Sequence, residues 1–513
     1  MERQIFAINK LSKLRMLEDI KYFDDNSNLY DVPVFLYEKI TKEITNLDPI
    51  IEENCIDNSL ASLSPIEIFQ LFFTEDLFEF LTNETNNYSI SKPHHKSRNI
   101  TIDEMKNFIY IYIFSSVLNL PEMKMLWNKD EYYTTIIPKI MSSNRFFHIN
   151  SNFHIQSTSL SDGNLKDSQI NEKTQKFKHV LDYLNEKWVT YYQYAKYLTI
   201  DECMSEFKGR ICFRQTLKDK KKQTGIKFFA KSSASKGYVY NLVPYTGKDF
   251  RFNQNIGIGA SVLCDFAKPH IGTDVHITFD NFYTTMYVIN FLNRNNIKFT
   301  ATLNNKRKCF PSEIKTKDLK GEEEMVLMRM DKTNIRFLIY KGRKQVNLVS
   351  NVYNGNMKKY KNKNGQEKIK PEMIAVYNLT KSGVDQVDAA SSIYSCQRKT
   401  YKWWKAVFFY LLDVTIHNAC VIYFSKNKQQ NSKMLFFRKY LYEQWFKKYI
   451  LPKSPFDENS IHHLEKTIVI RDCFLCSNKK NGGLQEVVFR THFICNICKI
   501  YLCHDCFKAY HNY

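Results

Sequence analysis

The chain has 513 residues, of which 43% are apolar and 15% aromatic, so it is not a disordered protein and its length requires several folded units. Its formal net charge is +21, from 74 Lys and Arg against 53 Asp and Glu, which favours a polyanion such as DNA or RNA as partner over a charge kept for solubility. No apolar run follows the first four residues, so we expect no secretory signal peptide. The 13 cysteines then indicate a reducing compartment and metal binding rather than disulfides.

The N-terminal part of the chain predicts an acidic tail followed by a helical unit. Residues 1–60 are acidic and weakly periodic, so we expect a flexible tail. Ser64-Pro65 is typical of a helix start, with serine as the cap and proline in the first turn. A second helix is expected over 102–118, although its apolar run also fits a strand. Residues 61–195 are therefore expected to be mainly helical.

Short apolar strands then replace the helices. Strands are expected at 226–230, 238–243 and 275–279, followed by a helix over 283–294. Strands that alternate with helices indicate an α/β layer. The charged and alternating sequence of 305–371 predicts a β-rich insertion into that layer.

Four aspartates stand where these elements end or begin. Asp201 and Asp280 each close a short apolar run, and Asp385 and Asp388 lie three residues apart on one face of an expected helix. Any one of them is also explained as a helix cap or a turn. Together, carboxylates from two strand ends and a helix can converge on two divalent cations that activate the attacking oxygen and stabilise the leaving oxygen of a phosphodiester. The set therefore predicts a phosphoryl-transfer site.

Basic residues follow the first of these acids directly. Lys208, Arg210 and Arg214 are expected to hold a phosphate backbone beside Asp201, although a charge run is more often only solvated. The lysines within 218–222 also fit a nuclear import signal, a pattern that often occurs by chance.

A second basic segment, Arg398-Lys399, precedes the most apolar run of the chain, from Trp403 to Phe424. The two tryptophans at 403 and 404 could stack on nucleic-acid bases, but large aromatic side chains are more often helix core. Polar residues interrupt the run, so we expect a buried helix rather than a membrane span.

The last 41 residues hold six of the 13 cysteines. They form three Cys-x-x-Cys pairs with a histidine beyond the last, which is the local spacing that tetrahedral zinc requires. The expected zinc ligands are Cys473, Cys476, Cys495, Cys498, Cys503, Cys506 and His511. Two complete sites need an eighth ligand, for which His492 or His504 is favoured over Asp505 or a water. A tail this short needs metal to fold.

These motifs, in this order, resemble the transposases of the piggyBac family over about residues 60–513. The matching segments are Ser64–Phe73, Leu120-Pro121, Met141–Phe146, Ile200–Met204, Phe207–Arg214, Phe279–Thr285, Ser382–Asp388 and Arg398–Trp404. The tail resembles that family's cross-brace zinc domain more than a RING-type ubiquitin-ligase domain, in which the middle and last pairs are usually farther apart. Leu303 stands where the family commonly has an arginine.

The resemblance implies an α/β fold: an RNase H-like catalytic core split by a β-rich insertion, with a mainly helical flanking domain and a small C-terminal cross-brace zinc domain. The expected parts are the flexible tail (1–60), a helical dimerisation and DNA-binding domain (61–195, completed by 395–450), the core (196–304 and 372–394), the insertion (305–371), a linker (451–471) and the zinc domain (472–513).

The resemblance also implies a function and its residues. It implies cut-and-paste DNA transposition at TTAA sites by a nuclear homodimer, with hairpinned transposon ends as intermediates and no membrane partner. Asp201, Asp280 and Asp385 would hold Mg²⁺ or Mn²⁺, with Asp388 as the fourth catalytic acid, and the tail would hold two Zn²⁺. The expected contacts to double-stranded DNA are Lys208, Arg210, Arg214, Lys306, Arg307, Arg398 and Lys399.

Two other functions remain open at this point. A host-retained protein derived from such a transposase would bind DNA without cutting it, and would share the zinc domain and the nuclear location. A general RNase H-like nuclease would cut nucleic acid without recognising transposon ends. The four acids favour a protein that cuts, and the zinc tail disfavours the general nuclease.

Overall fold

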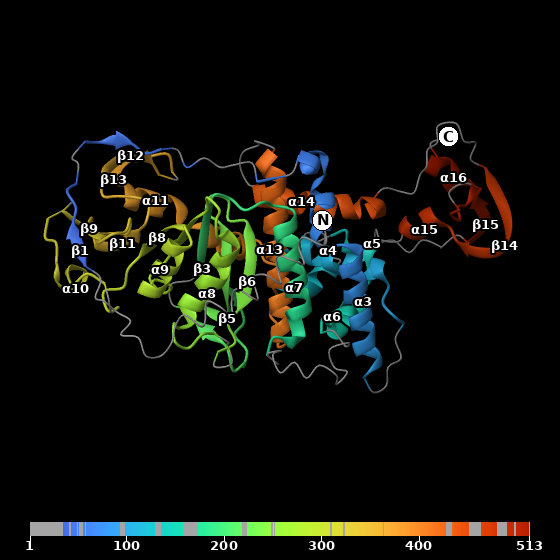
Figure 1. The fold of residues 1–513 in the computed structure, drawn as a ribbon. Coiled ribbons are helices and arrows are strands. Elements are labelled where there is room, and N and C mark those ends of the chain that lie inside the picture. The colour runs from blue at the N-terminus through green and yellow to red at the C-terminus, as the bar shows by residue number, and fades with distance from the viewer. Residues whose placement is uncertain are drawn as a thin grey trace. The chain divides into compact units, whose positions relative to one another are not determined.

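A computed structural model shows how the chain folds (Figure 1). The structure describes residues 34–40, 43–48, 50, 55–56, 58–92, 98–128, 135–156, 173–217, 223–247, 250, 252–307, 310–321, 324–362, 364–426, 433–450, 463–479, 490–496 and 499–511. The chain divides into two compact units, the first made of Met1–Thr74 with Ile155–Met434 and the second of Glu75–His154 with Leu435–Tyr513. The expected parts 61–195 and 395–450 are thus each shared between the two units.

The first unit combines thirteen described strands with helices on both sides. Its strands are β1 (Phe35–Tyr37), β2 (Thr45–Asn46), β3 (Tyr197–Glu206), β4 (Gln215–Thr216), β5 (Thr224–Ser233), β6 (Val239–Pro244), β7 (His276–Phe279), β8 (Lys298–Thr302), β9 (Met325–Met330), β10 (Arg336–Lys341), β11 (Gln345–Ser350), β12 (Met357–Lys361) and β13 (Glu367–Pro371). Its helices are η1 (Asn58–Ser62), α2 (Pro65–Phe72), α7 (Gln175–Thr190), α8 (Ile258–Ala267), η6 (Lys268–His270), α9 (Met286–Arg294), α10 (Glu313–Thr316), α11 (Glu372–Thr380), α12 (Gly383–Ile393) and α13 (Trp403–Lys426).

The second unit is mainly helical. Its elements are α3 (Glu75–Ile90), α4 (Ile102–Leu118), η2 (Met123–Trp127), α5 (Ile137–Ile140), α6 (Ser143–Asn152), α14 (Lys433–Ile450), β14 (Leu464–Asp472), α15 (Phe474–Lys479), β15 (Arg490–Cys495) and α16 (His504–His511).

One large sheet forms the core of the first unit. Its strand order is β1-β9-β10-β11-β8-β7-β3-β5-β4, and β6 pairs with β5. The strand β3 runs parallel to β7 and antiparallel to β5, while β7 runs parallel to β8. Parallel neighbours need crossover connections, and α9 supplies the one between β7 and β8. The strands expected at 226–230, 238–243 and 275–279 are confirmed as β5, β6 and β7.

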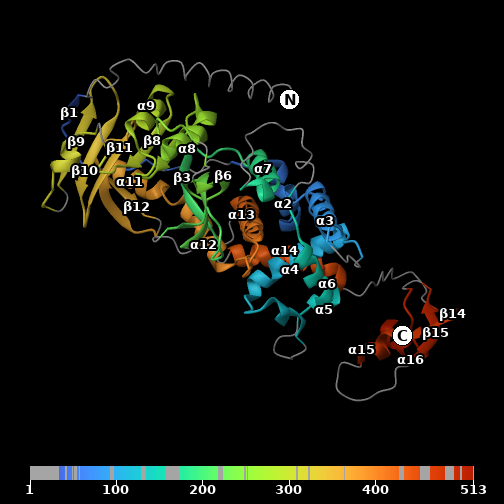
Figure 2. The ribbon, with the colours of Figure 1, turned by 90° about the horizontal axis from the view of Figure 1, so that it is seen from below.

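The β-rich segment expected to be an insertion is part of the same sheet. The strand β11 pairs with β8, and β10 and β9 follow in order beside it (Figure 2). The alternation of apolar and polar residues predicted strands here but not which strands they pair with. Pairing between β11 and β8 depends on contacts between residues far apart in the sequence. The strands β12 and β13 instead form a small separate sheet with β2.

Two strands also lie within the segment expected to be a flexible tail, so that expectation fails for residues 35–37 and 45–46. The strand β1 pairs with β9 at the edge of the large sheet, and β2 pairs with β12. The carboxylate of Glu38 forms an ion pair with Arg329 at 2.9 Å and accepts a hydrogen bond from Arg336 Nε at 2.9 Å. Strands of two or three residues are too short to show periodicity, and they form because the sheet edges offer unpaired backbone groups. Residues 1–33 lie outside the described part.

Helices cover both faces of the large sheet, as the view in Figure 2 shows. The helices α8 and α9 pack on one face, where the Lys231 ammonium of β5 donates to the carbonyl of Phe266 on α8 at 3.2 Å. The helices α11, α12 and α13 pack on the other face against β3. The core of the first unit therefore lies on both sides of β3, which is the central strand.

The helix α13 is confirmed as a buried helix. Within the described residues one segment, Trp403–Ser425, is long and apolar enough to cross a membrane, and 89% of its most apolar window is buried inside the protein. Its polar side chains bond the backbone of neighbouring strands: Asn418 pairs with both the N–H and the carbonyl of Val239 at 2.8 Å. His417 Nε2 lies 3.1 Å from the carbonyl of Gly237. These bonds explain polar residues in an otherwise apolar helix.

Two expected helices of the N-terminal part are confirmed, and both begin at a capping box. Ser64 caps α2 together with Glu67, and Thr101 caps α4 together with Glu104. In the second unit α4 packs against α14, where the ring of Tyr110 stacks on that of Trp445 at 4.6 Å between centroids.

The segment 451–471, expected to be a linker, is corrected in its last residues. The strand β14 begins at Leu464 and pairs with β15 of the cysteine-rich C-terminal segment. Most side chains of β14 are exposed on both faces, so its sequence lacks the alternation of apolar and polar residues that would have predicted a strand. Residues 451–462 lie outside the described part.

Candidate functional site

Asp201 and Asp280 lie at neighbouring positions of the large sheet. The register pairs Ile200 of β3 with Phe279, the last residue of β7, so Asp201 within β3 and Asp280 just after β7 each follow a paired residue. Both side chains are half-buried. Asp280 begins a turn in which its Oδ1 accepts from the N–H of Phe282 at 2.9 Å. The sequence placed both acids at strand ends, which holds for Asp280 but not for Asp201, because β3 continues to Glu206.

Asp385 and Asp388 lie in the first two turns of α12, which packs on β3. The helix approaches the sheet closely because its first residue is glycine. A Cβ at Gly383 would stand 2.4 Å from the carbonyl oxygen of Ser233 and 2.8 Å from Oγ1 of Thr199. On the other side of Asp385, the amide of Gln386 donates to the carbonyl of Ser235 at 3.0 Å.

Tyr377 on α11 feels the charge of three of the acids. Burial is the largest cause that raises the pKa of the Tyr377 phenol to about 12; a hydrogen bond with Thr302 opposes the rise, and the negative charges of Asp280, Asp201 and Asp385 add to it. The side chain of Asp385 is exposed.

A buried ion pair beside Asp201 was not foreseen from the sequence. Lys227 Nζ lies 3.1 Å from Oε1 of Glu202, and its ammonium lies over the rings of Phe229 and Phe282 at 4.6 and 4.7 Å. Burial would raise the pKa of Glu202, but hydrogen bonding to Asp201 and the Lys227 charge outweigh it and lower that pKa. The available signal was a lysine within an apolar strand pattern. The pair joins the Asp201 strand to the turn that follows Asp280.

The donor set suits a hard divalent cation, since all its members are carboxylates, two of them half-buried and adjacent. The carboxylate oxygens of the acids are less tightly grouped than the sulfurs of four cysteines in the C-terminal tail. Among the described residues, one group of three or more His, Cys, Asp or Glu side chains has all its ligand atoms within 4.8 Å of one another, and it consists of Cys473, Cys476, Cys503 and Cys506. The residues that would hold such a cation are Asp201, Asp280 and Asp385.

The loop after α12 is held by Asp413 of α13. The Asp413 carboxylate is 1% exposed and accepts from Ser395 Oγ at 3.0 Å and from the N–H of Cys396 at 3.0 and 3.1 Å. Gln397 reaches β3 from the same loop, where its amide donates to Ser205 Oγ at 3.0 Å. Asp413 thus ties the segment that follows α12 to the core.

We expect Asp413→Ala to lower the free energy of unfolding of the first unit by about 1.5–3 kcal/mol, the range for hydrogen bonds to a charged group. Asp413→Asn keeps an acceptor and should lose less. Urea unfolding followed by tryptophan fluorescence measures both variants. Equal stability of Asp413→Ala and the wild type would contradict a structural role for this carboxylate.

The expected DNA contacts near Asp201 lie on the surface. Lys208, Arg210 and Arg214 are exposed, and Lys208 pairs with Glu206 at 3.2 Å. Arg214 Nη1 donates to the carbonyls of Lys208 and Gly209 at 3.0 and 2.8 Å, which closes the loop between β3 and β4. The lysines of 218–222 lie outside the described residues.

The other four expected DNA contacts divide into two kinds. Lys306 and Lys399 are exposed, whereas Arg307 and Arg398 are half-buried. Arg307 Nη2 donates to the carbonyl of Phe282 at 2.8 Å, so it braces the turn after Asp280. Leu303, where an arginine was expected by resemblance, is buried with 6% exposure.

The tail brings four of its expected zinc ligands together. The sulfur of Cys476 lies 3.5 Å from that of Cys506 and 3.8 Å from that of Cys503, which lies 3.7 Å from Cys473. Zinc bonded tetrahedrally to thiolates at about 2.3 Å requires sulfurs about 3.8 Å apart, so the four sulfurs fit zinc. The group joins the first and third Cys-x-x-Cys pairs and passes over the middle pair, as a cross-brace requires.

The second set of expected zinc ligands is only partly described. Cys495 is buried at the end of β15. Cys498 and the side chain of His511 lie outside the described part. The two-site expectation therefore stays a prediction.

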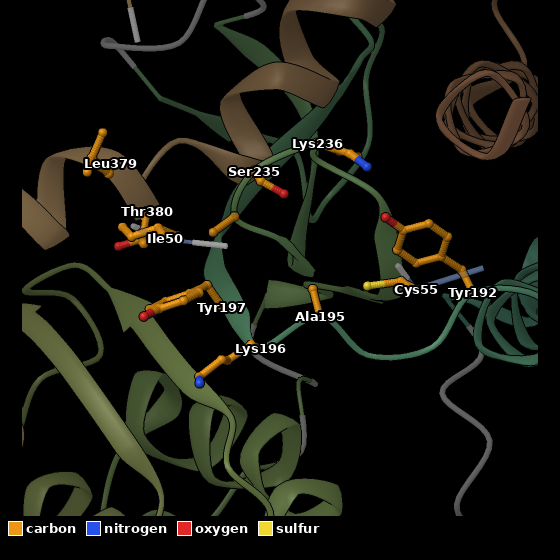
Figure 3. A pocket seen from close by; sticks show the side chains of 11 residues that line it. Ile50, Cys55, Tyr192, Ala195, Lys196, Tyr197, Ser235, Lys236, Leu379 and Thr380 are labelled. Atoms are coloured by element: carbon orange, nitrogen blue, oxygen red, sulfur yellow. The ribbon is translucent and has the colours of Figure 1, made fainter. Parts of the chain in front are cut away.

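A small hollow of about 30 Å³ lies at the start of β3, lined among others by Tyr197, Cys55 and Thr380 (Figure 3). None of the four acids lines it. Its size suits one or two waters rather than a substrate.

The chain belongs to a transposase family. The family model described as Transposase IS4 matches residues 64–420, which include all four acids, and the resemblance to piggyBac-type transposases is confirmed. A solved cryo-EM structure of a piggyBac transposase synaptic complex with hairpin DNA has the same fold, with a TM-score of 0.66, 22% identity, and coverage of 79% of this chain and 85% of that one.

Three human proteins are related to the chain. PiggyBac transposable element-derived protein 3 from Homo sapiens is 25% identical over 373 residues, which are 69% of this chain and 60% of that protein. The human chimeric ERCC6-PGBD3 protein has the same identity and length of match, covering 34% of that protein. Human piggyBac transposable element-derived protein 2 is 24% identical over 420 residues, 77% of this chain and 67% of that protein. The chain spans less than two thirds of the first two relatives.

Proposed function

We propose that this protein is a DNA transposase of the piggyBac type, which cuts and rejoins DNA at TTAA sites. The observation that carries the proposal is the neighbouring position of Asp201 and Asp280, with α12, which bears Asp385, packed on β3, within a chain of a transposase family. The net charge of +21 and the exposed cations after β3 suit a DNA substrate.

The core of this transposase is RNase H-like in our proposal. Its support is the strand order β6-β5-β3-β7-β8, in which β5 is antiparallel to its neighbours and β3, β7 and β8 are parallel. Such a mixed sheet places Asp201 on the central strand β3 and Asp280 just after its neighbour β7, and Asp385 lies on α12, which packs on β3 and β5. The long segment between β8 and α11 extends the sheet and carries no proposed catalytic residue.

The chemistry proposed is phosphodiester hydrolysis followed by attack of a 3′-hydroxyl. When bound, Mg²⁺ or Mn²⁺ activates the attacking oxygen and stabilises the leaving oxygen. Asp201, Asp280 and Asp385 hold and orient the cations, and Asp388 on the next turn of α12 is the fourth acid. The cations of the β3–β4 loop position the phosphate backbone without reading its sequence.

The proposal also covers the C-terminal domain, the oligomeric state and the cellular location. The C-terminal domain holds two zinc ions and binds transposon ends, the chain acts as a homodimer on double-stranded DNA, and it works in the nucleus. The solved relative in complex with hairpin DNA supports DNA as the partner.

A second candidate function is that of a host-retained DNA-binding protein that does not cut. Human relatives that are named as derived from transposable elements favour it. The retention of all four acids favours the active enzyme.

Strand cleavage distinguishes the two candidates. A labelled duplex that carries the terminal repeat of the encoding element beside TTAA is incubated with the full chain and Mg²⁺, with EDTA as the control. We expect nicks and hairpin ends that depend on Mg²⁺. Binding without any cleavage would establish the second candidate, and cleavage of RNA·DNA hybrids but not of transposon ends would establish a general nuclease.

A further inference from the structure

A row of buried hydroxyl groups crosses the centre of the large sheet. Thr199, Thr278, Thr300 and Ser350 stand side by side in register on β3, β7, β8 and β11. Each is at most 1% exposed. Four hydroxyl side chains in the core need partners, because an unpaired buried hydroxyl costs about 1–3 kcal/mol.

Two members of the row bond the end of α11. Thr199 Oγ1 donates to the carbonyl of Thr380 at 2.6 Å, and Thr278 Oγ1 lies 2.7 Å from Thr380 Oγ1. Because Thr380 Oγ1 donates to the carbonyl of Val376 at 2.8 Å, the Thr278 hydroxyl is the donor to Thr380. Thr380 is therefore bound by both strands that carry the first two acids.

The other two members of the row bond elsewhere. Thr300 Oγ1 donates to Ser350 Oγ at 3.2 Å and lies 3.0 Å from Nε2 of His276. Ser350 Oγ donates to the carbonyl of Phe299 at 2.7 Å. Thr300 thus has the same burial and the same register as Thr278 but no bond to α11.

The bonded threonines stand in a fixed relation to the acids. Asp201 lies two residues after Thr199, and Asp280 lies two residues after Thr278. Side chains two residues apart along a strand direction lie on the same face of the sheet, so each acid shares a face with its threonine. Thr380 ends α11, and α12 begins three residues later with Gly383, whose missing Cβ leaves room for Thr199 Oγ1. The junction between the helices, Thr380–Gly383, is thereby held on both strands next to the acids.

We propose that Thr380 is a positioning residue for the metal site, which sets the distance of Asp385 from Asp201 and Asp280 through its bonds to Thr199 and Thr278. The inference rests on the proposed function, since it assumes that these acids bind a divalent cation. Metal ligands that come from a helix and from strands must be held at fixed distances from one another, because a misplaced ligand weakens metal binding. Figure 3 shows Thr380 at the end of α11, near Tyr197 at the start of β3.

The test compares Thr380→Val and Thr278→Val with Thr300→Val in the full chain. Valine keeps the shape of threonine and removes only the hydroxyl. The half-saturating Mg²⁺ concentration for cleavage of the terminal-repeat duplex should rise about 10- to 100-fold in the first two variants, the usual effect of losing a group that orients a metal ligand. It should stay within about twofold of wild type in Thr300→Val, and Thr380→Ser should restore it.

A second measurement does not depend on cleavage. Mn²⁺ added without DNA should raise the thermal unfolding midpoint of wild type and of Thr300→Val, and the titration should shift to higher Mn²⁺ in Thr380→Val and Thr278→Val. The inference would be overturned, and the proposed function left standing, if all variants required the same metal concentration as the wild type. The same would follow if Thr300→Val weakened metal binding as much as Thr380→Val and Thr278→Val do. A wild type with neither cleavage nor a Mn²⁺ shift would overturn the inference and the proposed function together.

Discussion

Asp280→Asn is expected to reduce strand cleavage at least about a thousandfold, because a catalytic cation supplies several kcal/mol of transition-state stabilisation and each 1.4 kcal/mol is about tenfold in rate. Asparagine is chosen because its Oδ1 can still accept from the N–H of Phe282, so the turn after β7 is kept. Binding of the terminal-repeat duplex should remain, as measured by fluorescence anisotropy.

The matched control is Asp274→Asn. Asp274 lies just before the start of β7, whereas Asp280 follows its end. Asp274 is exposed and pairs with Lys196 and Lys298, and exposed ion pairs contribute little to stability. Its cleavage rate should equal that of the wild type. Undiminished cleavage by Asp280→Asn would remove Asp280 from the catalytic site.

Cys503→Ser is expected to abolish zinc binding at the four-cysteine site and to unfold the C-terminal domain. The buried cluster of that domain is small, with Cys473, Leu502 and Cys506 at its centre. Structural zinc contributes on the order of 10–16 kcal/mol of apparent binding free energy, so a domain of this size folds through its metal. Zinc content of the purified protein should fall by about one equivalent or more.

Limited proteolysis measures the unfolding directly, because cleavage within 464–511 should become fast in Cys503→Ser while the first unit stays intact. Cys212→Ser is the control, since Cys212 is an exposed cysteine outside the cluster. A Cys503→Ser protein with full zinc content and wild-type resistance would show that the four sulfurs do not hold the metal.

Local patterns singled out the acids and cysteines of the candidate site, whose roles stay predictions. Asp201 and Asp280 were found because each follows an apolar run, and the structure places those runs side by side as β3 and β7. The cysteine pairs were found by spacing alone, and the first and third pairs do meet. In both cases the signal lies within a few residues of the functional group.

Features that depend on distant partners were missed. The buried pair of Lys227 and Glu202 joins residues 25 apart, and Glu38 meets Arg336 across 298 residues. The strands β9–β11 were foreseen as strands but not as a continuation of the core sheet. Propensity and periodicity describe a single strand, whereas the choice of partner is made by packing.

The sequence by itself determined the family, the order of helices and strands around the acids, and the chemical types of ligand, because these follow from local spacing and alternation. Only the tertiary structure decided that the junction before α12, the helix of Asp385, is bound to β3 and β7. The bond from Thr199 to Thr380 spans 181 residues and that from Thr278 to Thr380 spans 102. A hydroxyl that finds its partner so far along the chain leaves no local pattern, since only the packed core brings the two groups into reach.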